Sequence, residues 1–86
     1  MEYSVYAIEN SNGKLYIGQT RDIEKRLKRH NQKLPAKKNG FTAINKGDWM
    51  VIYEERFETR AEAMRREKEL KTSRGRGFLK QFRRYI

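Results

Sequence analysis

Residues 3–20 of the chain read YSVYAIENSNGKLYIGQT, and this stretch decides the fold. Tyr3–Glu9 and Leu15–Gln19 are both rich in aromatic and β-branched residues, which is typical of strands. Between them, Asn10–Lys14 contains Asn, Ser and Gly, and the glycine can adopt the positive φ that a tight turn needs. The stretch therefore predicts a β-hairpin.

The sequence leaves the length of the hairpin loop open, and this length sets which side chains share a face of the sheet. With a two-residue turn, Glu9 would oppose Tyr16, and Tyr6 would point to the other face. With a three-residue loop that ends in a left-handed Gly13, Ile8 would oppose Tyr16. Tyr6 and Tyr16 would then lie on the same face.

The rest of the chain alternates helical and extended patterns. The predicted elements are a helix over Arg21–Gln32, an irregular loop over Lys33–Gly47, a strand over Trp49–Phe57, a helix over Arg60–Lys71, a break over Thr72–Gly77 and a short amphipathic helix through Phe78, Leu79, Phe82 and Ile86. We expect Thr20 to cap the first helix and the capping box Thr59-Arg60-Ala61-Glu62 to start the second. The order ββαβαα predicts an α+β fold, with a small three-stranded antiparallel sheet flanked by helices, in one domain over residues 1–86.

Charge is the strongest signal in the composition. The 86 residues include 21 Lys and Arg against 11 Asp and Glu, so the net charge is +10. A small chain this basic usually binds a polyanion, because neutralising phosphates releases condensed counterions. We therefore expect a nucleic-acid partner. We expect no membrane partner, because no long basic amphipathic helix carries an apolar face.

Residues with metal or redox chemistry are scarce. The absence of Cys excludes disulfides, thiolate zinc sites and iron–sulfur clusters, and the single His excludes zinc sites built from two histidines. The longest apolar run, Trp49–Tyr53, is far below the ~20 residues that cross a bilayer, and no secretory signal pattern opens the chain. We expect a cytoplasmic protein that acts as a monomer.

Polar side chains interrupt the apolar stripes of both main helices. The residues that share a face are Ile23, Arg26, Leu27 and His30 on the first helix and Ala63, Met64, Glu67 and Leu70 on the second. Arg26, His30 and Glu67 must therefore be paired, solvated in a cleft or bound to a metal. Ordinary structural roles stay open: Glu67 can pair with Lys71, Arg26 can extend to solvent and His30 can bond a carbonyl.

Four segments together resemble the GIY-YIG nuclease family. They are Val5–Ile8, Leu15–Thr20, Asp22–His30 and Ala61–Lys71, in the order and spacing of that family. The first motif departs from the usual Gly-Ile-Tyr, because Ser4-Val5-Tyr6 stands there, but the tyrosine is kept.

The resemblance implies hydrolysis of DNA phosphodiester bonds with one divalent cation, Mg²⁺ or Mn²⁺. It implies that Glu67 is the metal ligand and that the catalytic set is Tyr6, Tyr16, Arg26, His30 and Glu67. The expected substrate contacts are Gly18, Gln19, Lys28, Arg29 and Lys46. Family members often take their specificity from other domains or partners, so we expect weak or structure-selective cleavage and a protein partner that supplies specificity.

The implied chemistry gives each residue type a role. Arg26 would bind phosphate oxygens through its planar fork. Tyr6, assisted by Tyr16 or His30, would orient or deprotonate the attacking water. A free tyrosine has a pKa near ~10, so the base role requires the positive charge of the site to lower that pKa. Two alternatives stay open: a nucleic-acid-binding module with a vestigial site, and an RNA-binding protein of ribosomal type.

Overall fold

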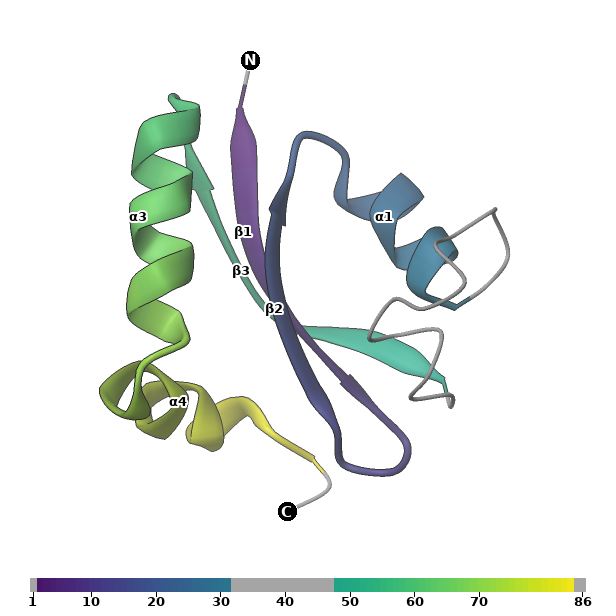
Figure 1. Ribbon diagram of the computed structural model, residues 1–86. Coiled ribbons are helices and arrows are strands. Elements are labelled where there is room, and N and C mark those ends of the chain that lie inside the picture. The colour runs from purple at the N-terminus through teal and green to yellow at the C-terminus, as the bar shows by residue number, and fades with distance from the viewer. Residues whose placement is uncertain (1, 32–47, 85–86) are drawn as a thin grey trace.

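The computed structural model describes residues 2–31 and 48–84 and has the predicted α+β architecture (Figure 1). Its elements are the strands β1 (Tyr3–Asn10), β2 (Leu15–Thr20) and β3 (Trp49–Phe57), the helices α1 (Ile23–His30), α3 (Arg60–Leu70) and α4 (Ser73–Leu79), and a 3₁₀ turn over Lys80–Phe82. The predicted loop over Lys33–Gly47 and the predicted helical residue Ile86 lie outside the described residues. Within the described ranges, none of the helices is long and apolar enough to traverse a bilayer.

The three strands form one antiparallel sheet in the order β2-β1-β3, so β2 is an edge strand and β1 is central. The hairpin has the three-residue loop, because Ile8 opposes Tyr16 in the register of the two strands. Gly13 has φ 79°, a left-handed conformation that suits glycine. Tyr6 opposes Gly18 two positions further along, so both tyrosines lie on the same face of the sheet.

Helices cover both faces of the sheet, with α3 and α4 on one face and α1 on the other (Figure 1). The residues buried beneath α3 and α4 are Val5, Ala7, Ile17, Ala63, Leu70 and Leu79. The residues buried on the other face are Tyr6, Ile8 and Trp49, and Ile23 and Leu27 of α1 pack against them. Alternation along β1 therefore sends Tyr6 to the α1 face and its neighbours Val5 and Ala7 to the α3 face.

The start of α1 differs from the prediction. Asp22, rather than Thr20, caps this helix, because its Oδ1 accepts the backbone N–H of Lys25 at 3.1 Å. The hydroxyl of Thr20 accepts the N–H of Asp22 at 3.2 Å and so orders the turn before the helix. The cap predicted for the second main helix is confirmed, since Thr59 Oγ1 accepts the N–H of Glu62 at 3.2 Å.

The apolar stripe of α3 is narrower than the stripe predicted from the sequence. Ala63 and Leu70 are buried, but Met64 is 42% exposed and lies outside the core. At the C-terminal end, Leu79 is buried, whereas Phe78 and Phe82 stay partly exposed and pack edge to face at 5.6 Å between ring centroids. The core beneath these helices therefore rests on small and aliphatic side chains.

The predicted break over residues 72–77 is wrong, because α4 begins at Ser73. Thr72 caps α4, and its Oγ1 accepts the N–H of Gly75 at 3.1 Å. Gly75 is buried where α4 turns back against α3, and a Cβ there would stand 2.2 Å from the carbonyl oxygen of Glu69. The glycine thus allows two helices to approach each other instead of ending one.

We expect Gly75→Ala to lower the free energy of unfolding by about 1–3 kcal/mol or more, because the new methyl group meets backbone that cannot move aside. Gly77→Ala is the matched control, because a Cβ at that position meets nothing within 4 Å. Alanine is the better helix former by about 1 kcal/mol, so this control should leave stability unchanged or raise it. Urea unfolding followed by circular dichroism would measure both variants, and equal losses would contradict the close-approach explanation.

Candidate functional site

Two tyrosines from the hairpin lie together on the face that α1 covers. Tyr6 is fully buried, whereas Tyr16 is half-buried, and their ring centroids are 6.2 Å apart at an interplanar angle of 37°. The first comes from the central strand and the second from the edge strand. The pair therefore joins the core to the open edge of the sheet.

Gly18 allows the hydroxyl of Tyr6 to approach the backbone of β2. A Cβ at this position would stand 2.8 Å from the Tyr6 hydroxyl and 3.0 Å from a ring carbon of Tyr16. Any larger residue would displace both rings. The glycine of the second motif thus holds the two phenols in their present arrangement, rather than serving a turn.

Arg26 and Glu67 act on the same hydroxyl group. Burial raises the pKa of Tyr6 most strongly, and Tyr16 raises it too, through its charge and through a side-chain hydrogen bond. The positive charge of Arg26 lowers the pKa of Tyr6, and the negative charge of Glu67 raises it. Arg26 lies on α1 and Glu67 on α3, and these two helices cover opposite faces of the sheet (Figure 1).

The raised pKa of Tyr6 predicts a loss of stability at alkaline pH. The unfolded chain releases this phenolic proton near pH ~10, whereas the folded protein keeps it. Below pH 10 the contribution to stability is complete, and above it the free energy of unfolding should fall by about 1.4 kcal/mol per pH unit from this one group. Urea unfolding between pH 9 and pH 11 should show a shallower fall for Tyr6→Phe than for the wild type. Parallel slopes would contradict the assignment.

Arg26 is half-buried on α1 and lines a groove of about 330 Å³ at the C-terminal end of β2. The other lining residues are Tyr3, Gln19, Thr20, Arg21, Asp22 and Arg60. Three guanidinium groups face this groove against one carboxylate. We name it the arginine groove. It brings Gln19 and Arg26 together, as a substrate site on a phosphate backbone would require.

Glu67 is paired with Lys71, which is one of the ordinary roles that the sequence left open. The Lys71 Nζ lies 2.6 Å from a carboxylate oxygen of Glu67, one helical turn away. The Glu67 side chain is 22% exposed and that of Lys71 is 50% exposed, so the pair is open to solvent and not sealed in the core. In the described part of the chain, no three His, Cys, Asp or Glu side chains gather into a cation-binding group. A metal ion here would take Glu67 as a lone carboxylate ligand.

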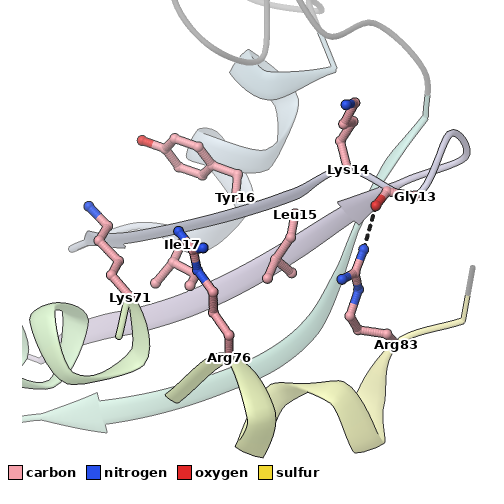
Figure 2. A pocket seen from close by; sticks show the side chains of 8 residues that line it. All are labelled: Gly13, Lys14, Leu15, Tyr16, Ile17, Lys71, Arg76 and Arg83. Carbon is pink, nitrogen blue, oxygen red and sulfur yellow. Dashed lines mark hydrogen bonds between the residues drawn. The ribbon is translucent and has the colours of Figure 1, made fainter. Parts of the chain in front are cut away.

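A second groove of about 520 Å³ lies at the opposite end of β2, between the hairpin and α4 (Figure 2). We name it the hairpin groove. Its lining residues are Gly13, Lys14, Leu15, Tyr16, Ile17, Lys71, Arg76 and Arg83. Lys14 and Lys71 are not among the residues predicted for the catalytic site or for substrate contacts. Their positions in the sequence could have identified them as candidates, because Lys14 directly precedes the strand of the second motif and Lys71 directly follows the helix that carries Glu67.

The remaining predicted residues are placed less fully. Lys28 is exposed on α1. His30 ends α1, but its side chain and that of Arg29 lie outside the described part of the structure. Lys46 also lies outside the described residues. The structure therefore brings together Tyr6, Tyr16, Gly18, Arg26 and Glu67, with Gln19 in the adjoining arginine groove.

The family model of the GIY-YIG catalytic domain matches residues 2–81 of the chain. The chain belongs to the GIY-YIG family. A UPF0213 protein of Staphylococcus saprophyticus is 38% identical over 71 residues, which is 83% of this chain and 82% of the relative. A UPF0213 protein of Staphylococcus aureus is 38% identical over 68 residues, 79% of this chain and 78% of the relative.

A solved GIY-YIG relative has the same architecture. The solution NMR structure of a UPF0213 protein from Bacillus halodurans superposes with a TM-score of 0.55 at 28% identity and covers 96% of this chain and 86% of that one. GIY-YIG domains form a nuclease family, and the names of these relatives state no activity. In this GIY-YIG domain the two motif tyrosines are Tyr6 and Tyr16, and Gly18 is the glycine that packs against both.

Proposed function

We propose that this GIY-YIG domain is a metal-dependent DNA endonuclease that hydrolyses phosphodiester bonds with weak or structure-selective specificity. One observation carries the proposal: Tyr6 packs against Tyr16 and Gly18, and the charges of both Arg26 and Glu67 act on its buried hydroxyl. A guanidinium, a carboxylate and two phenols at an open edge suit a phosphodiester, whose transition state carries extra negative charge. The net charge of +10 supports a polyanionic substrate.

The donor set fits a single Mg²⁺ or Mn²⁺ ion held by Glu67. A lone carboxylate leaves most coordination positions to water and phosphate, which is the usual habit of these ions with nucleic acids. When bound, the ion supplies positive charge that stabilises the leaving 3′-oxygen. The Glu67 side chain is 22% exposed beside Lys71, so its carboxylate is open to an ion from solvent.

The side chains of the protein bind the phosphate and position the attacking water. Arg26 binds the phosphate oxygens through two N–H groups of its fork. Burial raises the pKa of Tyr6, so this phenol stays neutral and does not meet the requirement of a lowered pKa for a base. Tyr6 therefore positions its hydrogen-bonded neighbour Tyr16, and half-exposed Tyr16 contacts the attacking water. The water oxygen bonds to phosphorus and loses a proton to solvent, while the bond to the 3′-oxygen breaks and this oxygen takes up a proton from solvent, so the products carry a 5′-phosphate and a 3′-hydroxyl.

A plasmid-nicking assay with Mg²⁺ tests this proposal. The wild type should convert supercoiled to open-circle DNA, and EDTA should stop the reaction. Arg26→Ala should lower the rate by about 10²–10³-fold, because removing a charge-stabilising donor commonly costs that much. Lys25→Ala, an exposed neighbour on the same helix, is the matched control and should cleave normally. Cleavage in EDTA, or an unchanged rate for Arg26→Ala, would refute the mechanism.

The ion pair of Glu67 with Lys71 also favours a second candidate function, a nucleic-acid-binding module with a vestigial site, because Lys71 already gives this carboxylate a positively charged partner. That module would bind DNA or structured RNA in the same assay without nicking any DNA. For the nuclease we propose a cytoplasmic monomer that acts on the DNA backbone and takes its specificity from a protein partner.

A further inference from the structure

We propose that the hairpin groove binds a backbone phosphate of the DNA next to the cleaved bond, so that the substrate lies along the edge of β2. The proposal rests on the proposed nuclease function and adds a second anchoring point for its substrate. Its observations are the composition of the groove, the pairing of its cations and its position relative to Tyr16.

The groove is lined by cations and by no carboxylate. Lys71 and Arg76 extend toward β2 from the end of α3 and from α4, while Lys14 projects from the other side of the strand (Figure 2). The guanidinium of Arg83 already has protein partners, because its Nε lies 2.9 Å from a carboxylate oxygen of Glu9 and its Nη2 donates to the carbonyl of Gly13. It forms a fixed wall of the groove.

The cations of the hairpin groove are available to an external anion. Among the residues that the structure describes, neither Lys14 nor Arg76 makes an ion pair, and both are exposed. Lys71 uses one contact on Glu67, and an ammonium group has three N–H donors. A bound phosphate would supply the negative charge that Lys14 and Arg76 do not receive from a described side chain.

The position of the groove ties it to the candidate site. Tyr16 lines the hairpin groove and also packs against Tyr6, so the groove adjoins the phenol pair directly. The arginine groove, with Arg26, lies at the other end of β2. The six residues of β2 span about 20 Å at ~3.3 Å per residue, and duplex DNA rises ~3.4 Å per nucleotide along one strand. β2 is therefore long enough to lie beside several nucleotides of one DNA strand.

Binding of a fluorescent 20-base-pair DNA duplex, followed by anisotropy across a salt series in EDTA, tests the groove without requiring cleavage. Lys14→Glu/Arg76→Glu should weaken binding at least about tenfold and reduce the slope of log affinity against log salt by about 0.9, because the groove contacts one phosphate and each lost phosphate contact contributes about 0.9. The neutral pair Lys14→Gln/Arg76→Gln should give the same slope change with a smaller loss of affinity. Both substituted residues are exposed, and thermal unfolding would verify the fold.

The matched control is Arg65→Glu/Arg74→Glu, which changes net charge equally. Arg65 and Arg74 are exposed on α3 and α4 and do not line the hairpin groove. If this control and the Lys14/Arg76 variant lose affinity equally, the groove proposal is overturned, whereas cleavage by the wild type would still support the nuclease. If the Lys14/Arg76 variant alone loses affinity but the wild type never nicks DNA, the groove proposal stands and the nuclease proposal fails.

Discussion

Replacement of Glu67 by alanine is expected to lower the rate of DNA cleavage at least about 10³-fold while leaving DNA affinity unchanged or slightly higher. Glu67 is the ligand proposed for the metal ion, and the described part of the chain holds no group of three His, Cys, Asp or Glu side chains that could replace it, so we expect the contribution of the ion to the transition state to be lost with this carboxylate. A metal ion commonly supplies several kcal/mol of charge stabilisation, and each 1.36 kcal/mol is about tenfold in rate. Affinity should persist because Glu67 lines neither groove, and its removal leaves the Lys71 ammonium free to bind phosphate.

Nicking rates with Mg²⁺ and titration of Mn²⁺ into the protein by calorimetry would test this expectation together. Glu69→Gln is the matched control, since Glu69 lies on the same helix, is exposed and pairs with Arg66 at 3.4 Å. The control should cleave DNA and bind Mn²⁺ as the wild type does. Undiminished cleavage or undiminished Mn²⁺ binding by Glu67→Ala would remove the metal assignment.

Arg83→Ala is expected to lower the free energy of unfolding by about 3–5 kcal/mol, because it leaves the buried carboxylate of Glu9 without its charged partner. Glu9 is fully buried, and its two oxygens accept from the Arg83 Nε at 2.9 Å and from the backbone N–H of Arg84 at 2.8 Å. The ion pair fastens the end of the described chain to the hairpin. For a domain of this size we expect the Tm to fall by at least about 12 °C.

Thermal unfolding by circular dichroism would measure this loss. Arg84→Ala is the matched control, because Arg84 bonds Glu9 through its backbone N–H, which alanine keeps. Its stability should change by less than about 0.5 kcal/mol. The double variant Glu9→Leu/Arg83→Leu should recover much of the loss, since replacing both partners of a buried pair with apolar groups is often neutral. A small loss for Arg83→Ala would show that water or a neighbouring cation solvates Glu9.

Local signals in the sequence predicted the elements well. The strand Trp49–Phe57 has the predicted bounds. The helix α3 begins at the predicted residue, because the side chain of Thr59 caps it by accepting the backbone N–H of Glu62, three residues later. At α1, Thr20 and Asp22 are both good caps, and the prediction chose the wrong one. The two residues lie only two positions apart, and both are favoured N-cap types, so N-cap propensity does not show which of them caps the helix.

The candidate site was predicted from periodicity and resemblance, but its arrangement was not. Both hairpin turns fitted the residues around Gly13, and the register placed Tyr6 and Tyr16 on one face. A base role for Tyr6 requires the positive charge of the site to lower its pKa. Burial outweighs the charge of Arg26 and raises it, because desolvation depends on every atom packed around the phenol.

The sequence by itself determined the order of strands and helices, the cap of α3 and the residue types available for chemistry. These depend on hydrogen bonds and periodicity within a few neighbouring residues. The tertiary structure decided the burial of Glu9 against Arg83, the close approach at Gly75 and the groove that joins Lys14 to Arg76. Each of these brings together groups from separate elements, and their energies depend on solvent exclusion and contact distances that exist only after the sheet and helices have packed.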